Sequence, residues 1–253
     1  MLKIRIYCSI AALLAAMPVH AFDFGGLFDN GRMGDLGKTL QSKSGSGLTG
    51  ISNQDQVGGL KQALTQAAQT AVKELGKKNG YLGNEKVRIP LPGNLQRVDD
   101  LLHQFGMGKY RDDLKTSINR AAEAAVPEAK NLLLGAVKSM SIEDAKGILT
   151  GGSDAATQYF RRKTETQIAT RFRPIVEKSM RKVQLAEKYD EFAGKGAKFG
   201  LVEQRDANLN DYITRKAMDG LFLMMADQEK AIRANPLQAT GNLAKKVFSA
   251  VRQ

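Results

Sequence analysis

Apolar residues recur every three to four positions along most of the chain, and this period predicts α-helices. In the clearest case, leucine, alanine and valine share one face from Gln54 to Gly76, with Gln, Thr and Lys opposite. The same period predicts helices over about 94–105, 109–125, 127–140, 141–150, 153–183, 208–235 and 243–251. Strand patterns are nearly absent. The chain is therefore expected to be all-α, a single bundle of about seven to nine helices with mostly antiparallel neighbours, because the connections are short.

Capping residues mark several of these helix ends. Ser141 and Asp144 have the spacing of a capping box, and Asn208 is a good N-cap for the helix that follows it. Ser153 is expected to cap the longest helix. Pro174 lies inside that helix and predicts a kink.

Three segments lack a helical period. Residues 79–94 carry three Gly, two Pro and an extended alternation, so we expect an ordered loop in which Arg88 bonds to backbone carbonyls. Residues 186–207 are rich in Gly and Lys and predict a short helix and a loop. Residues 22–54 are dense in Gly and Ser and predict a mobile tail. Its apolar residues would dock on the domain, on a membrane surface or nowhere: Phe22, Phe24, Leu27 and Phe28.

The first residues have the pattern of a secretory signal peptide. Lys3 and Arg5 precede a mostly apolar stretch, and small residues flank His20 where a signal peptidase cleaves. The apolar stretch is shorter than the roughly 20 residues that span a bilayer. We expect cleavage near Ala21 and a periplasmic or secreted protein, divided into a signal peptide (1–21), a flexible tail (22–54) and a helical domain (55–253).

Composition narrows the chemistry of the mature chain. The only cysteine, Cys8, leaves with the signal peptide, and His103 is then the single histidine. No disulfide, thiolate nucleophile or usual zinc site is therefore expected within one protomer, and no cofactor. We find no Ser-His-Asp arrangement and no paired acids suited to acid-base catalysis, so an enzyme is not expected.

The charge balance favours anionic partners. The formal net charge of +12 falls to +10 when Lys3 and Arg5 are removed. Export argues against nucleic acid and leaves phospholipid head groups, lipopolysaccharide, fatty-acid carboxylates and acidic polymers. Much of this charge is also expected simply to be solvated surface.

Three stretches of the sequence resemble a bacterial family known as domain of unknown function 4197. They are GYLGNEKVRIPLPGNLQRVDDLL, the run from NRAAEAAVPEAK through SIEDAKGILTGGSDAATQYFRRKT, and NLNDYITRKAMDGLFLMMADQEKAIRANP. The resemblance spans about residues 57–248. It implies an exported helical protein, often with a Gly- and Ser-rich tail, and implies no activity.

An apolar run in the helix from Asn208 is the first candidate site. The sequence GLFLMMA is apolar all round, which predicts a helix surrounded by others, and flexible methionines suit irregular apolar ligands. Ordinary core packing explains the same residues. If a cavity exists, its walls would be Leu221, Phe222, Met224 and Met225 opposite Tyr159, Phe160 and Phe172, with Arg161, Arg162, Arg171 and Arg173 near its mouth.

The loop before the longest helix is the second candidate. Gly151, Gly152 and Ser153 would leave backbone N–H groups free at a helix N-terminus, which favours an anion, with Arg161 and Arg162 closing over it. A tight turn explains the glycines equally well, and Asp154 places a competing negative charge there.

Two functions follow from these candidates. The first is a non-catalytic binding protein for a fatty-acyl chain or lipid, held between the helices from Ser153 and Asn208. The second is a structural or interaction protein of the cell envelope with a fully packed core, which contacts an envelope protein or a membrane surface. Amphipathic helices serve a monomer core and a dimer seam equally well, so a homodimer stays open.

Overall fold

The computed structural model describes residues 48–92, 108–181, 183 and 207–251. These residues contain no strand, which confirms the all-α class for them. The signal peptide, most of the tail, the helix expected over 94–105 and the segment 186–207 lie outside them, so the total of seven to nine helices remains a prediction. The helices are α2 (Asn53–Gly76), α4 (Gly108–Ala125), η1 (Val126–Glu128), α5 (Ala129–Lys138), α6 (Ile142–Leu149), α7 (Ala155–Met180), α9 (Leu209–Ala234), η3 (Pro236–Gln238) and α10 (Asn242–Val251).

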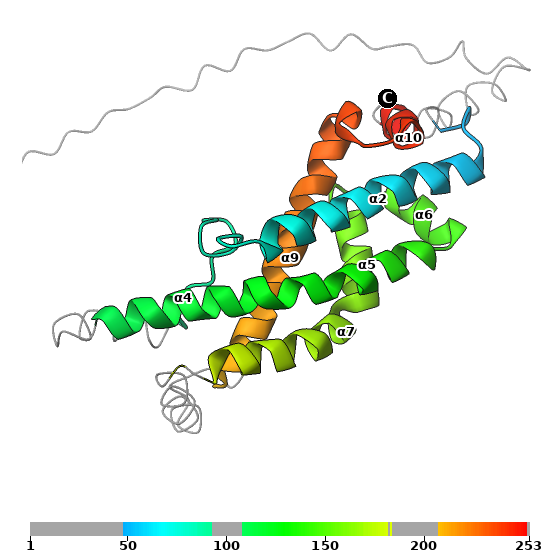
Figure 1. Ribbon diagram of the computed structural model, residues 1–253. Helices are drawn as coiled ribbons and strands as arrows, with labels where there is room; N and C mark the ends of the chain where they lie inside the picture. Colours follow the sequence, from blue (N-terminus) through cyan, green and yellow to red (C-terminus); the bar gives the residue numbers. More distant parts are fainter. Residues whose placement is uncertain (1–47, 93–107, 182, 184–206, 252–253) are drawn as a thin grey trace, which may run out of the picture. The chain divides into compact units, whose positions relative to one another are not determined.

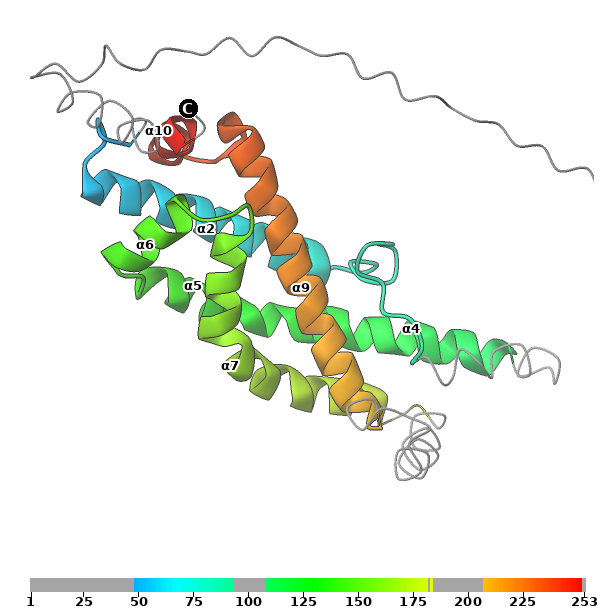
Figure 2. The same cartoon turned by 180° about the vertical axis from the view of Figure 1, so that it is seen from behind.

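One long rod supports the other helices. Helices α4 and α5 lie end to end, joined by the 3-10 turn η1, and α2 runs beside them in the opposite direction (Figure 1). Pro127 lies in η1, where a missing N–H costs no intrahelical bond. Helix α7 follows the short α6, packs on both halves of the rod and is bent (Figures 1 and 2).

Helix α9 crosses the middle of the molecule. It packs against α7, α2 and α4, and the two views show it passing diagonally over them (Figure 2). Its N-terminus is capped by Asn208, whose side chain accepts from the Asp211 N–H at 3.0 Å. Its C-terminus lies at Ala234, before Asn235 and Pro236. Both ends agree with the sequence pattern.

Helix α10 packs closely on α2 through a pair of glycines. A Cβ atom on Gly59 would lie 2.7 Å from the Leu243 carbonyl oxygen and 2.7 Å from Val247 Cγ2. The absence of a side chain therefore lets the two backbones approach.

Substituting Gly59 tests this contact. We expect Gly59→Ala to lower the free energy of unfolding by about 1–3 kcal/mol, because the added methyl overpacks against backbone that cannot move alone. Gly135→Ala in α5 is the matched control, since nothing lies within 4 Å of the added Cβ. There the gain in helix propensity, up to about 1 kcal/mol, should stabilise the protein in urea unfolding. Equal effects of the two changes would contradict the contact.

Residues 77–92, which follow α2, form an ordered loop as expected, and side chains of α4 bond to its backbone. Asn119 is fully buried: its Oδ1 accepts from the Ile89 N–H at 2.8 Å, and its Nδ2 donates to the Ile89 carbonyl at 2.9 Å. The buried Glu123 accepts from the N–H groups of Tyr81 and Leu82, each at 3.1 Å. Side chains of α4 thus satisfy backbone groups of the loop that a neighbouring β-strand would otherwise satisfy.

Tyr81 joins this loop to α9. Its ring is fully buried, and its hydroxyl donates to the Ala217 carbonyl at 2.6 Å. Burial raises the pKa of Tyr81 far above its usual value near 10, and the charges of Asp219 and Glu123 raise it further.

This shift predicts a loss of stability at alkaline pH. Above pH ~10 the unfolded chain releases the Tyr81 proton while the folded chain keeps it, so stability is full below that pH and falls as pH rises. Tyr81→Phe should cost about 0.5–1.5 kcal/mol at neutral pH through the lost hydrogen bond. The difference in free energy of unfolding between wild type and Tyr81→Phe, measured by urea unfolding, should shrink as the pH rises above ~10. A difference that does not change with pH would refute the buried, protonated phenol.

Candidate functional site

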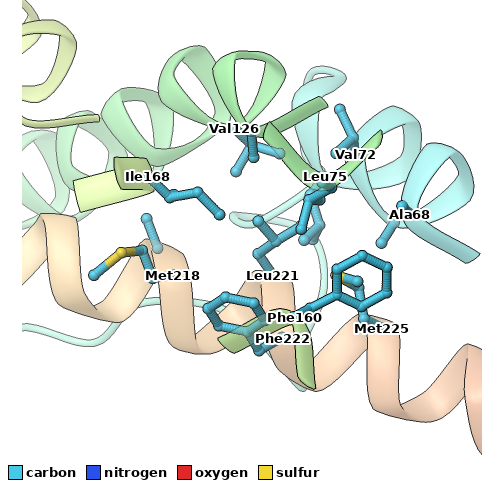
Figure 3. Packing of buried hydrophobic residues seen from close by; sticks show 14 of the residues in the cluster. Ala68, Val72, Leu75, Val126, Phe160, Ile168, Met218, Leu221, Phe222 and Met225 are labelled. Atoms are coloured by element: carbon cyan, nitrogen blue, oxygen red, sulfur yellow. The ribbon is translucent and has the colours of Figure 1, made fainter. Parts of the chain in front are cut away.

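The aromatic and apolar side chains between α7 and α9, which would line a cavity if one existed, are closely packed. Each of them is at most 2 % exposed, and Figure 3 shows Phe160, Phe222, Leu221 and Met225 converging with side chains of α2 and η1. A void wide enough for an acyl chain would expose its lining to a water-sized sphere, and these side chains have almost no such surface. Of the two alternatives that the sequence left open, this arrangement corresponds to ordinary core packing. The closed walls are Tyr159, Phe160, Phe172, Leu221, Phe222 and Met225.

The apolar run of α9 is also not surrounded on all sides. Leu223 is 44 % exposed, and Met224 is partly buried, with its sulfur 3.8 Å from Asn84 Nδ2. The run therefore has one outer edge, which contacts the loop between α2 and α4. Met224 does not share the closed interior with Met225.

Two of the arginines expected at a cavity mouth hold α7 to α9. The guanidinium of Arg161 lies over the ring of Phe222, 4.6 Å from its centroid, and pairs with Glu165 at 2.8 Å and Asp219 at 3.2 Å. These contacts are cation–π and charge-assisted bonds across the helix seam. Arg161 is thus already engaged and does not face an open head-group site.

Arg173 has a similar place further along α7. It pairs with Glu177 at 3.2 Å and with Asp211 of α9 at 3.0 Å. Arg162 and Arg171 are exposed, and within the described residues neither has an ion-pair partner. Because a helix rises 1.5 Å per residue, 161 and 173 are about 18 Å apart along the axis. The four arginines therefore do not gather at one mouth.

The N-terminus of α7 does bind an anion, and that anion belongs to the protein. The buried carboxylate of Glu229, from α9, accepts from the Ala156 N–H and the Thr157 N–H at 3.0 Å each, and from the Thr157 hydroxyl at 3.0 Å. Backbone N–H groups and the helix dipole favour a negative charge at this position.

Arg233 completes the group around Glu229. Its Nε and one terminal nitrogen lie 3.1 and 2.9 Å from Glu229 Oε1, and the same terminal nitrogen donates to the Ile148 carbonyl at 2.8 Å. One carboxylate and one guanidinium therefore join the end of α6, the start of α7 and the last turns of α9. We call Glu229, Arg233, Ala156 and Thr157 the α7 cap.

The loop expected to bind an external anion does not form the α7 cap. Gly151 donates its N–H to the Ile148 carbonyl at 3.3 Å, and Gly152 and Ser153 are exposed. The N-cap residue is Asp154, one position later than the expected Ser153, and its side chain makes no capping bond. Glu229 takes the N–H groups of Ala156 and Thr157, and the anion site at Gly151, Gly152 and Ser153 stays a prediction.

Three hollows on the described surface lie at or near the candidate residues and along α2. The hollow of about 450 Å³ between α6 and α7 includes Tyr159 and Arg162, but also the carboxylates of Glu143 and Asp144, which disfavour an anionic ligand. The hollow of about 180 Å³ lies between the loop at 86–90 and α9, beside Arg88. Arg88 pairs with Glu85 at 3.5 Å, and its buried Nε has no partner, so the expected bonds to backbone carbonyls are absent within the described residues. The largest, about 780 Å³, is a polar groove along α2 and the turn at 240–241.

Among the described residues, no three His, Cys, Asp or Glu side chains gather in a way that suits a metal ion. No helix among them combines the length and apolarity needed to cross a bilayer.

A family model matches most of the chain. The model describes a protein of unknown function (DUF4197) and matches residues 50–249. The chain belongs to this family. Comparisons with curated proteins and with solved structures gave no match.

The α7 cap of this DUF4197 chain carried a sequence signal that was missed. On α9 the buried face runs through Leu221, Met225, Glu229 and Ile232, so a carboxylate stands where the period calls for an apolar residue. Arg233 follows at i+4. A charged pair on the core face of a helix predicts a buried partner, because an unpaired charge there is costly.

Proposed function

We propose that this protein is a non-catalytic, exported component of the cell envelope that acts through its surface and holds no small molecule in its core. The closed packing between α7 and α9 supports this proposal most directly. The proposal includes cleavage of a signal peptide near Ala21 and a periplasmic or secreted location. It also includes one bundle of seven to nine helices over 55–253, with mostly antiparallel neighbours.

The polar interior supports a structural role in preference to chemistry. The two buried carboxylates, Glu123 and Glu229, accept from backbone N–H groups and pair with Arg120 and Arg233. A group that serves as general acid or base needs a reacting atom within reach. The atoms within hydrogen-bond distance of Glu123 and Glu229 are backbone and side-chain groups of the protein that hold its helices and loop together.

The same packing weighs against a lipid carrier. Admitting an acyl chain between α7 and α9 would require moving the buried rings of Phe160 and Phe222 and breaking the contacts of Arg161 with Phe222 and Asp219. Each buried aromatic contributes several kcal/mol to packing, about 3–5 when it is truncated. Bound ligand would have to compensate that loss.

Native mass spectrometry of the chain purified from the periplasmic fraction tests this function. After a high-salt wash that releases surface-bound lipid, we expect the native mass to equal the polypeptide from residue 22 onward, alone or as an integer multiple, with no lipid in an organic extract. A retained fatty acid or phospholipid would contradict the packed core. An intact N-terminal segment on cytoplasmic protein would contradict export independently.

A further inference from the structure

The outer face of α7 carries more basic than acidic side chains. Its exposed residues are otherwise Gln, Thr and one Pro, and the side chains of its two acidic residues, Glu165 and Glu177, are 43 % and 40 % exposed. These acids pair with Arg161 and Arg173 of the same helix. We call the exposed bases of α7 and its C-cap the basic face: Arg162, Lys163, Arg171, Arg173, Lys178 and Arg181.

The basic face is long and one-sided. From 162 to 181 it extends about 28 Å along the axis at 1.5 Å per residue. At 100° per residue its members fall within about half of the helix circumference. The opposite half packs in the core through Ile168, Phe172 and Val176, so α7 presents these charges in one direction.

The acidic side chains of α9 next to α7 are paired. Asp211 and Asp219 of α9, whose side chains are 44 % and 45 % exposed, pair with Arg173 and Arg161. Glu143 and Asp144 of α6 line the hollow beside Arg162. Arg162, Arg171 and Lys178 have no ion pair among the described residues.

The chemistry of the basic face fits a diffuse anionic surface better than a folded protein. Specific protein interfaces depend on buried aromatic or apolar anchors. The exposed large apolar residues of the described chain are Ile142, Leu223 and Leu237, and none belongs to α7. Binding of single-stranded nucleic acid would likewise use exposed aromatic rings, which this face lacks.

We propose that the basic face of α7 binds the anionic phospholipid head groups of a membrane surface, peripherally and reversibly. Arginine guanidinium groups bond to phosphate bidentately, and lysines add point charges. Because no apolar side chain accompanies them, α7 lies on the head groups without entering the bilayer. This inference rests on the proposed function, since it requires a protein that acts through its surface outside the cytoplasm.

Vesicle binding of the mature chain tests the proposal. Wild type should bind vesicles of phosphatidylglycerol mixed with phosphatidylcholine, should not bind phosphatidylcholine alone, and should be released by salt. Neutralising four members of the basic face should weaken binding about fivefold per residue, or by at least ~100-fold in total. The test variant is Arg162→Gln, Lys163→Gln, Arg171→Gln and Lys178→Gln.

A matched variant separates the basic face from net charge. It loses the same charge from α2, the turn after it and α10, and it should change vesicle binding no more than a few-fold. The control changes are Lys73→Gln, Lys78→Gln, Lys245→Gln and Lys246→Gln. Thermal unfolding by circular dichroism confirms that both variants are folded.

Three outcomes would overturn the proposal: no binding of wild type to anionic vesicles, equal weakening in both variants, or binding that survives loss of the basic face. None of these outcomes affects the packed core, which is contradicted when lipid stays with the protein after the high-salt wash.

Discussion

Replacing Glu229 by alanine is expected to lower the free energy of unfolding by about 3–5 kcal/mol. The change leaves the Ala156 N–H, the Thr157 N–H and the Thr157 hydroxyl without their acceptor. It also leaves the guanidinium of Arg233, whose side chain is 14 % exposed, without its counter-charge. Uncompensated buried polar groups are among the few mechanisms with effects this large.

The matched control for Glu229→Ala is Asp144, a carboxylate that caps the exposed start of α6. Asp144 accepts from the Ser141 N–H in the capping box of α6, so Asp144→Ala should cost about 1 kcal/mol. Urea unfolding measures both changes, and a double-mutant cycle with Arg233→Met isolates the coupling between Glu229 and Arg233. If Glu229→Ala costs no more than Asp144→Ala, the α7 cap does not have the role assigned to it.

Leu221→Ala is expected to have the second large effect, a loss of about 3–5 kcal/mol. Leu221 is fully buried, so truncation leaves a cavity in a core that is otherwise filled. Leu223→Ala is the same chemical change two residues later on the same helix, at a side chain that is 44 % exposed. It should cost less than about 1 kcal/mol in the same urea titration. Similar small costs at both positions would mean that Leu221 faces an unfilled space.

Local patterns in the sequence predicted the helix ends well. The capping box at Ser141, the Asn208 cap and the last helical residue of α2, Gly76, are all as expected. Each depends on residues within one turn of the helix end, so the information is contained in a short stretch. The start of α7 is the exception. There the free N–H groups are satisfied by Glu229, more than 70 positions away.

The same distinction explains the cavity prediction. The run from Leu221 to Met225 has one composition whether it borders a void or a filled core, and only the partner helices decide. Phe160 of α7, Leu75 of α2 and Val126 of η1 lie around Leu221 (Figure 3). No pairing between these elements can be derived from hydrophobic period alone. Arg161 illustrates the point, since its partners Phe222 and Asp219 come from another helix.

For the loop from 77 to 92, the sequence predicts the conformation but not the contacts that hold it. Its glycines and prolines predict an ordered, non-helical segment, and the structure has one. The reason for its order is remote: Asn119 bonds to both backbone groups of Ile89, and Tyr81 reaches Ala217 of α9. These polar contacts replace the strand pairing that an extended segment would otherwise need.

The filled core between α7 and α9 is tested most directly by methyl NMR spectra recorded with dissolved xenon. Apolar cavities that exclude water bind xenon, whereas a close-packed core does not. The account predicts no xenon-dependent shifts for the methyl groups of Ile168, Leu221 and Met225 in wild type, and clear shifts at Ile168 and Met225 in Leu221→Ala. Xenon-dependent shifts of these methyl groups in the wild-type protein would contradict it.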